Sequence, residues 1–326
     1  MSIVITIVVS FALTVLFGRF LIPMLHALKA GQSIREIGPK WHQVKEGTPT
    51  MGGLMFMAAA LICVIVAGWT AMAAGTYEHL MVLGFSLIYG AIGFIDDFVK
   101  VKMKRNLGLT ALQKLILQLA VTLAYLALLR WNGNLTSEVY IPFVNVSLQL
   151  PWVLYLFFAV FVIVGCVNAV NLTDGVDGLA SGVTLPVMVF FTVVACSWGN
   201  DTLALFPAAL VGGLLGFLVY NFHPAKVFMG DTGSLFLGGA VCGMAFALVM
   251  PLILILVGII YIVEVLSVIL QVIYFKATHG KRIFRMTPIH HHFEMGGWSE
   301  VKIFSVFTGV TVVMCMLAWL GIMNRF

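Results

Sequence analysis

The sequence predicts an all-α, polytopic membrane protein with ten transmembrane helices. Hydrophobic residues make up 61% of the 326-residue chain, charged residues make up 10%, and the mean hydropathy is +1.08. Apolar runs of about 20 residues recur along the chain, which is the length that an α-helix needs to cross a bilayer. No stretch is typical of a linker between domains, so we expect residues 1–326 to form a single integral membrane domain.

Each predicted span is an apolar run that ends at polar or charged residues. The first run, 3–25, lacks a charged start and a small-residue cleavage site, so we expect a retained membrane helix rather than a signal peptide. The other nine predicted spans are, in order, 51–74, 78–97, 110–130, 151–170, 179–197, 204–221, 233–250, 252–275 and 303–323.

The loop at 131–150 is predicted to contain a small β-hairpin. Its residues from 138 onward alternate between apolar and polar side chains and include turn formers, a pattern typical of paired strands. We therefore expect a hairpin near 136–148, on the outer surface of the protein.

The distribution of Lys and Arg predicts the orientation of the helices. Most of the 18 basic residues lie in the loops that follow the first, third, seventh and ninth spans. These loops share one side of the membrane, and an excess of Lys and Arg marks the cytoplasmic side. We therefore expect both termini to lie outside. Because this asymmetry accounts for most of the net charge of +5, we expect no nucleic-acid partner.

The five cysteines, by contrast, predict no special chemistry. Their number is odd, none forms a CxxC pair, and all lie in or beside apolar spans. This pattern supports neither a disulfide framework nor a zinc site, so we expect small core residues.

Two adjacent carboxylates, Asp96 and Asp97, end the third predicted span. Like charges at a membrane boundary repel each other unless a cation or a proton relieves them. Lys100 lies one helical turn away, so a structural ion pair is the simpler interpretation. One lysine does not need two acids, however, and we favour a functional site.

A second polar series begins at the end of the fifth span and continues into the loop after it. Asn168, Asn171, Asp174 and Asp177 recur at every third position, which brings successive side chains together at a helix end. A loop with capping side chains would explain one of the acids but not the whole series. We interpret the series as part of a binding site.

A third polar segment joins the seventh and eighth spans. Asp231 is expected at a helix N-terminus, where free amide groups favour phosphate or carboxylate. A plain helix cap would explain Asp231 alone, but Lys226 and Phe228 add a cation and a stacking surface. Carboxylates together with substrate phosphates are typical ligands of Mg²⁺, which we expect as the cofactor.

The last inner loop carries three consecutive histidines. His290, His291 and His292 point in different directions and are poor joint ligands for one zinc ion, so we expect them to bind phosphate or compensate charge. Glu264 and Gln271 lie in the ninth span. The sequence leaves open whether Glu264 is a structural partner or lines the site, whereas Gln271, nearer the inner side, is the better site candidate.

With these motifs, the chain resembles the phospho-N-acetylmuramoyl-pentapeptide transferase family, within the polyprenyl-phosphate N-acetylhexosamine-1-phosphate transferase superfamily. The resemblance extends over nearly the whole length. It is most specific at 45–53 (KEGTPTMGG), 93–100 (GFIDDFVK), 168–178 (NAVNLTDGVDG), 221–234 (NFHPAKVFMGDTGS) and 288–294 (PIHHHFE).

The resemblance implies an enzyme of a bacterial inner membrane with its active site on the cytoplasmic face. It would transfer phospho-MurNAc-pentapeptide from UDP-MurNAc-pentapeptide to undecaprenyl phosphate, releasing UMP and forming lipid I, in a Mg²⁺-dependent reaction and as a homodimer. Asp231 would hold Mg²⁺, and Asp97 would stand near the lipid phosphate with Asp96 beside it. The residues that would offset diphosphate charge are Lys45, Lys100, Lys114 and His290, and those that would hold the nucleotide are Asn168, Asn221, Phe228 and Gln271.

Two other functions fit parts of the pattern. A transporter or lipid flippase would also combine many helices with embedded acids, but here the polar residues gather at one face and no inverted repeat is evident. A transferase of GlcNAc-1-phosphate would share the acids, but the 288–294 stretch argues against it. The sequence leaves open whether transfer is direct or passes through a covalent intermediate.

Overall fold

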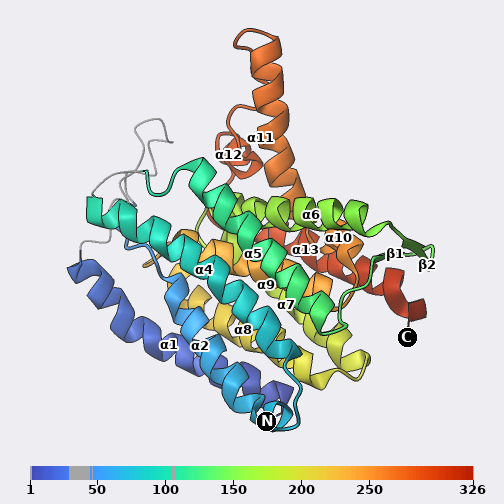
Figure 1. The fold of residues 1–326 in the computed structure, drawn as a ribbon. Helices are drawn as coiled ribbons and strands as arrows, with labels where there is room; N and C mark the ends of the chain where they lie inside the picture. The colour runs from blue at the N-terminus through green and yellow to red at the C-terminus, as the bar shows by residue number, and fades with distance from the viewer. Residues whose placement is uncertain (1, 29–44, 46, 104–106, 326) are drawn as a thin grey trace.

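The computed structural model describes residues 2–28, 45, 47–103 and 107–325, and these form a helical bundle with one small hairpin (Figure 1). The basic residues between 29 and 40, Lys104 and Arg105, which contributed to the predicted orientation, lie outside the described residues. The longer helices are α1 (Ile3–Ala27), α2 (Gly53–Ala67), α4 (Glu78–Met103), α5 (Ala111–Trp131), α6 (Trp152–Thr173), α7 (Leu179–Ser197), α8 (Asp201–Asn221), α9 (Gly230–Ala247), α11 (Ile259–Ala277) and α13 (Glu300–Ile322).

The predicted all-α membrane architecture is confirmed, but the predicted count of ten spans is not exact. Within the described residues, eight helices are long and apolar enough to cross a membrane. The second predicted span breaks at Gly68 into α2 and the short α3 (Trp69–Ala73). The other exception is α9, in which every residue from Thr232 to Phe246 is buried. A helix enclosed by other helices does not face lipid, so it can carry small and polar residues that lower its hydropathy.

Close packing of α4 on α9 brings the predicted acids together. α9 lies at the centre of the bundle, and its longest contact is with α4. A side chain at Gly93 in α4 would overlap the carbonyl oxygen of Asp231 in α9, so a glycine is required at this crossing. The crossing lies one helical turn before Asp96 and Asp97.

The ninth predicted span, 252–275, is divided into three pieces. A 3₁₀ turn (Pro251–Ile253) and α10 (Leu254–Val257) precede a break at Gly258, and α11 follows. α11 then leaves the bundle and projects from it, with α12 (Ile289–Glu294) beside it (Figure 1). Most of its surface is therefore exposed and apolar, as expected of a helix surrounded by lipid.

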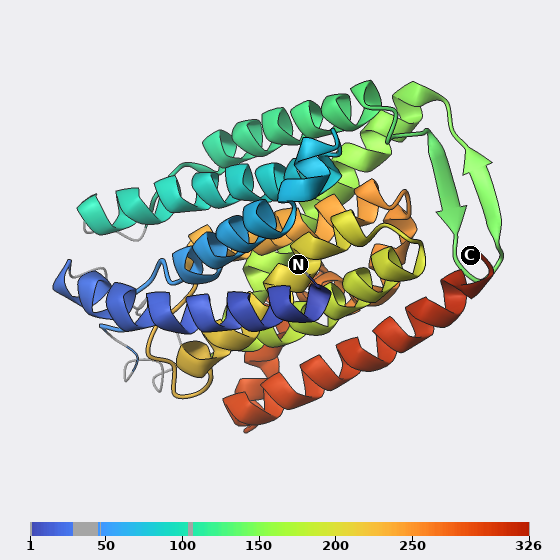
Figure 2. The same cartoon turned by 90° about the horizontal axis from the view of Figure 1, so that it is seen from below.

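The predicted hairpin is present and marks one end of the bundle. β1 (Glu138–Ile141) pairs with β2 (Val146–Gln149) in an antiparallel register. The amide of Phe143, in its turn, donates to the carbonyl oxygen of Gly321 at 2.8 Å, so the hairpin lies against the C-terminal end of α13 (Figure 2). The N-terminal end of α13 lies at the opposite end of the bundle, among the loops that carry the polar motifs.

Candidate active site

Three carboxylates from two helices meet at the end of α4. Asp96 and Asp97 are buried, Asp231 in the first turn of α9 is partly exposed, and one oxygen from each lies within 4.8 Å of the others. The adjacent acids and the distant one were predicted from separate motifs. The structure brings them together because α4 and α9 cross at Gly93.

Two lysines neutralise part of this charge. Lys100 Nζ lies 2.6 Å from Asp96 Oδ2, 3.5 Å from Asp97 Oδ1 and 3.1 Å from Asp231 Oδ2. Lys114, near the start of α5, lies 3.1 Å from Asp96 Oδ2 and 2.6 Å from Asp231 Oδ2. Both predicted lysines are therefore part of the acid cluster, which we define as Asp96, Asp97, Asp231, Lys100 and Lys114.

Asp97 also caps the central helix. Its Oδ2 accepts hydrogen bonds from the amide of Thr232 at 2.9 Å and from the hydroxyl of Thr232 at 2.8 Å. A carboxylate at a helix N-terminus satisfies a free amide and interacts favourably with the helix dipole. Asp97 therefore fixes the first turn of α9 and, with it, the position of Asp231.

The two asparagines of α6 have different surroundings. Asn171 Nδ2 donates to Asp231 Oδ1 at 3.0 Å and to Ser234 Oγ at 2.7 Å, so Asn171 joins the acid cluster. Asn168 lies one turn deeper and is not brought into the cluster. Its Nδ2 donates to Gln118 Oε1 at 2.8 Å, which forms a pair of amides between α5 and α6.

The loop before α9 pairs with the segment before α2. The amide of Phe228 donates to the carbonyl oxygen of Pro49 at 2.8 Å, and the amide of Gly52 donates back to Phe228 at 2.8 Å. Asn221 closes this loop by donating to the carbonyl oxygen of Val227 at 2.9 Å. The ring of Phe228 is half-buried, whereas Lys226 is exposed.

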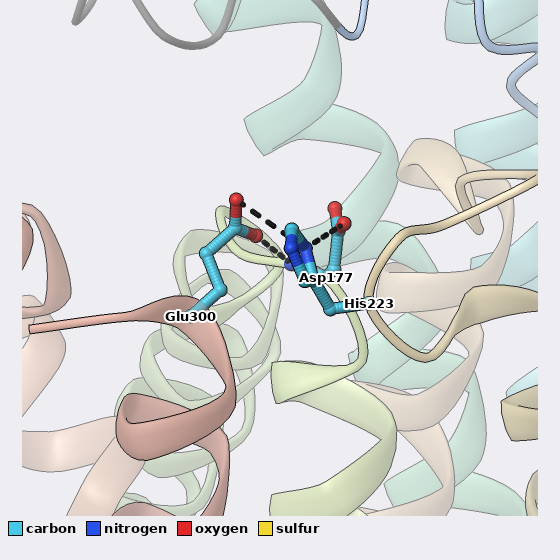
Figure 3. Close-up of side chains that lie close together, drawn as sticks. All are labelled: Asp177, His223 and Glu300. Carbon is cyan, nitrogen blue, oxygen red and sulfur yellow. Dashed lines mark hydrogen bonds and ion pairs between the residues drawn. The ribbon is translucent and has the colours of Figure 1, made fainter.

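A second polar cluster comprises Lys45, Asp177, His223 and Glu300, the last three of which are drawn in Figure 3. Lys45 Nζ lies 2.7 Å from Asp177 Oδ1 and 2.6 Å from Glu300 Oε2. His223 Nδ1 lies 2.9 Å from Asp177 Oδ2 and 3.7 Å from Glu300 Oε1. This Lys45 cluster ties together the loops before α2, α7 and α9 and the start of α13.

Burial and charge give Asp174 and Asp177 opposite pKa shifts. Burial, followed by the negative charges of Asp231, Asp97 and Asp177, raises the pKa of Asp174 to about 8. Burial also opposes ionisation of Asp177, but hydrogen bonding and charge from Lys45, with bonds from Ala225 and His223, outweigh it and lower its pKa. Along the chain, Asp174 lies between Asn171, which bonds to Asp231 of the acid cluster, and Asp177 of the Lys45 cluster.

The three histidines face three different partners, as predicted from their consecutive positions. His290 Nδ1 lies 3.1 Å from Glu264 Oε2, and His291 Nδ1 lies 2.5 Å from Glu294 Oε2. His292 Nδ1 accepts the amide of Arg285 at 3.1 Å. Gln271 Oε1 accepts the amides of Ile283 and Phe284, at 3.1 and 2.9 Å, and so fastens the same loop to α11.

The acid cluster has the donors that a hard divalent cation requires. Three carboxylates supply oxygen ligands at one point, and Lys100 and Lys114 now supply there the positive charge that a bound cation would bring. The Lys45 cluster is a poorer fit, because it has two carboxylates rather than three and its third donor is an imidazole nitrogen.

Comparison with known proteins gives a consistent result. The model described as glycosyl transferase family 4 matches residues 79–249, and a phospho-N-acetylmuramoyl-pentapeptide-transferase signature matches residues 45–57. A phospho-N-acetylmuramoyl-pentapeptide-transferase of Clostridium acetobutylicum is 48% identical over 322 residues, covering 98% of this chain and 99% of the relative. The chain belongs to the phospho-N-acetylmuramoyl-pentapeptide-transferase family.

Other members of this transferase family are similarly related. The protein of that name from Halalkalibacterium halodurans is 48% identical over 313 residues, covering 96% of this chain and 95% of its own length. The one from Listeria monocytogenes is 46% identical over 308 residues, with 94% of each chain covered. The family signature at 45–57 includes Lys45 and the segment that pairs with the loop before Asp231.

Several residues of the site were not predicted from the sequence. Glu300 lies in the first turn of α13, where an acid is expected simply because of the helix dipole. His223 was obscured by the stronger signal of Asp231 in the same segment. Gln118 lies within an apolar span and has no sequence neighbour that would mark it. The position of Gln118 deep in α5 was the one available signal, because a polar side chain at membrane depth needs a partner.

Proposed function

We propose that this enzyme transfers phospho-MurNAc-pentapeptide from UDP-MurNAc-pentapeptide to undecaprenyl phosphate, releasing UMP and forming lipid I. The observation that carries the proposal is the acid cluster, where three carboxylates and two lysines converge, in a chain of this transferase family. The names of the relatives support MurNAc-pentapeptide over GlcNAc as the transferred sugar.

The reaction joins two negatively charged groups, so its main requirement is positive charge. A phosphate monoester attacks a diphosphate, and catalysis of such transfers depends on positioning and electrostatic stabilisation. Lys100 and Lys114 are suited to this role, because their ammonium groups can exchange carboxylate partners for diphosphate oxygens. The three histidines, with His290 nearest the loop at Asp174, would add to this charge compensation.

A strong general base is not required. The second pKa of a phosphate monoester is about 6, so the attacking phosphate is largely dianionic at neutral pH. Asp97 would stand near this phosphate with Asp96 beside it. The hydrogen bonds that Asp97 accepts from Thr232 support a role for Asp97 in holding Asp231 in place.

We propose Mg²⁺ as the cofactor, held by Asp231 with the neighbouring carboxylates. Once bound, the cation would neutralise charge on the diphosphate oxygens. Asn171 would orient Asp231, since it donates to Oδ1 and leaves Oδ2 to the cations.

The nucleotide would lie against the loop before α9, with uracil stacked on the half-buried ring of Phe228. Asn221 shapes this loop, and Asp177 accepts the amide of Ala225 within it. Lys45 and Asp174 would complete the binding site for the nucleotide. Gln271 would use its Nε2, because its oxygen already accepts two amides. Asn168 would have to release Gln118 to reach a ligand.

The proposed placement is the inner membrane of a bacterium, with the site on the cytoplasmic face, both termini outside and two copies in a homodimer. The basic loops support the orientation, since Lys100, Lys114, Lys226 and Lys281 lie at the site end of the bundle.

The test is UMP release by the purified protein with UDP-MurNAc-pentapeptide, undecaprenyl phosphate and Mg²⁺. We expect release that needs both the lipid and the cation, and a loss of at least about 100-fold in Asp231→Asn. Asp201→Asn is the matched control, because Asp201 also lies in a first helical turn, at the start of α8, but is exposed. Consumption of UDP-GlcNAc instead would identify a transferase of the simpler sugar, and turnover of neither substrate would reject the proposal.

A further inference from the structure

Glu264 is a carboxylate at membrane depth, on a helix that mostly faces lipid. The buried residues of α11 form one stripe: Ile260, Tyr261, Glu264, Ser267 and Gln271. Burying a carboxylate is costly unless it has a partner, so the partner of Glu264 indicates why it is there.

That partner is His290. Glu264 Oε2 lies 3.1 Å from His290 Nδ1, and the two side chains are 0% and 1% exposed. The neighbouring hydroxyl groups on the stripe have partners other than the Glu264 carboxylate. The hydroxyl of Tyr261 is bonded to Thr184 at 2.8 Å, and the hydroxyl of Ser267 donates to the carbonyl oxygen of Glu264 at 2.7 Å.

The opposite edge of the His290 ring rests on the loop of the site. Its Nε2 is buried and has no hydrogen-bond partner among the described residues. A side chain at Gly175 would overlap this nitrogen, so the ring occupies the space that a glycine leaves free. Gly175 directly follows Asp174, in the segment that runs from Asn171 beside Asp231 to Asp177 of the Lys45 cluster.

We propose that Glu264 is a positioning residue for His290. Its carboxylate, 3.1 Å from Nδ1, accepts the Nδ1–H of the ring, and this holds Nε2 against Gly175 in the loop of the site, where the ring can take up a proton and offset the charge of a substrate phosphate group. A carboxylate that fixes the tautomer and orientation of a functional imidazole is a common arrangement. The identity of the ligand rests on the proposed function, whereas the Glu264–His290 pairing does not.

The first test reads the proton on His290 directly. Nitrogen-15 NMR of histidine-labelled protein, with His290 assigned by the His290→Gln variant, reports which ring nitrogen is protonated. We expect Nδ1 of His290 to carry a proton in the substrate-free protein, and the proton to move to Nε2 in Glu264→Ala. An unprotonated Nδ1 in the unsubstituted protein, or an unchanged signal in the variant, would overturn the proposal.

The second test is kinetic. We expect Glu264→Ala to lower kcat by about 10- to 100-fold, the usual range for loss of an orienting partner, with a smaller change in KM. Glu264→Gln should recover part of this loss, because its amide oxygen still accepts from Nδ1. In the His290→Ala background, Glu264→Ala should cost nothing further. Ser267→Ala, on the same stripe, is the matched control and should keep its kcat.

The outcomes separate this proposal from the proposed function. If the unsubstituted protein releases no UMP, the proposed function fails and the NMR test still decides the pairing. If the protein is active but the losses from Glu264→Ala and His290→Ala multiply, the positioning role is rejected and the transferase reaction stands. If kcat falls only in proportion to a lowered Tm, Glu264 is structural and the proposal is equally rejected.

Discussion

Asp174 and Asp177 lie three residues apart, yet their surroundings give them opposite charge states. Asp174 is half-buried, and burial together with the negative charges of three other aspartates raises its pKa to about 8, which keeps most of it protonated at neutral pH. Asp177 has Lys45, His223 and the amide of Ala225 around it and stays ionised. One loop therefore presents a hydrogen-bond donor and an anion side by side, which is a common feature of sites that handle charged substrates.

The pKa of Asp174 predicts a pH-dependent stability. Its folded value of about 8 exceeds the ordinary 3.8, so the folded state binds the proton more tightly. The resulting stabilisation is fully present below pH 3.8 and is lost as the pH rises through 8, at up to about 1.4 kcal/mol per pH unit. Asp174→Asn should remove this slope. Thermal unfolding of both proteins in detergent and EDTA, from pH 5 to 9, would show their Tm difference changing with pH, whereas parallel Tm profiles would contradict the assignment.

Loss of the Lys45 ammonium group is expected to lower the stability of the protein at constant pH. Its ammonium group lies between two largely buried carboxylates, and removing it leaves both without their cation. We expect Lys45→Met to destabilise the protein by on the order of 3 kcal/mol. Lys226→Met, in a neighbouring loop, removes an exposed lysine and should leave Tm nearly unchanged. Equal Tm values for the two variants would show that the Lys45 cluster adds little.

At the scale of elements, α9 organises the site because every other part of the acid cluster is placed against it. Asp97 caps it, Asn171 reaches its first turn, and the segment 49–53 pairs with the residues that lead into it. A buried helix rich in small residues allows these approaches, whereas a helix of large apolar residues would keep its neighbours apart.

The α4–α9 crossing predicts a strict need for glycine at position 93. A methyl group there would overlap the carbonyl oxygen of Asp231. Because this oxygen belongs to the backbone, it cannot move away by a change of rotamer. We expect Gly93→Ala to cost about 1–3 kcal/mol and to lower UMP release by displacing Asp231. Gly84→Ala is the control on the same helix, because nothing lies within 4 Å of the added carbon. Its helix propensity should make it neutral or stabilising, and a similar loss in both variants would refute the packing argument.

At the scale of the whole molecule, the chain termini and the polar site lie at opposite ends of the bundle. The hairpin lies against Gly321, and Arg325 lies over the ring of Tyr140, so the C-terminus and the hairpin share one end. Ser10, in the first half of α1, bonds to Ala209 in the first half of α8, which places the N-terminus at that end too. The acid cluster, the Lys45 cluster and the histidine loop lie at the other end.

This separation predicts the labelling pattern of intact cells. In a variant without native cysteines, a membrane-impermeant maleimide should label Ser2→Cys and Asn324→Cys, because both positions are exposed at the end proposed to lie outside. Lys226→Cys and Lys281→Cys are equally exposed, at the site end, and should react only after the cells are opened. The reverse pattern would invert the proposed topology and place the site outside.

The sequence by itself determined most of the membrane helices, where the hairpin lies, and which short motifs carry the acids, lysines and histidines. These features follow from apolar runs, alternation and local spacing, which neighbouring residues set. Only the tertiary structure decided that Asp97 caps α9, that Asn168 pairs with Gln118, and that Asp177 meets Lys45, His223 and Glu300. It also decided that α9 lies inside the bundle and that Glu264 faces His290. Each of these contacts joins residues far apart in the chain, and packing in three dimensions, not spacing along the sequence, selects such partners.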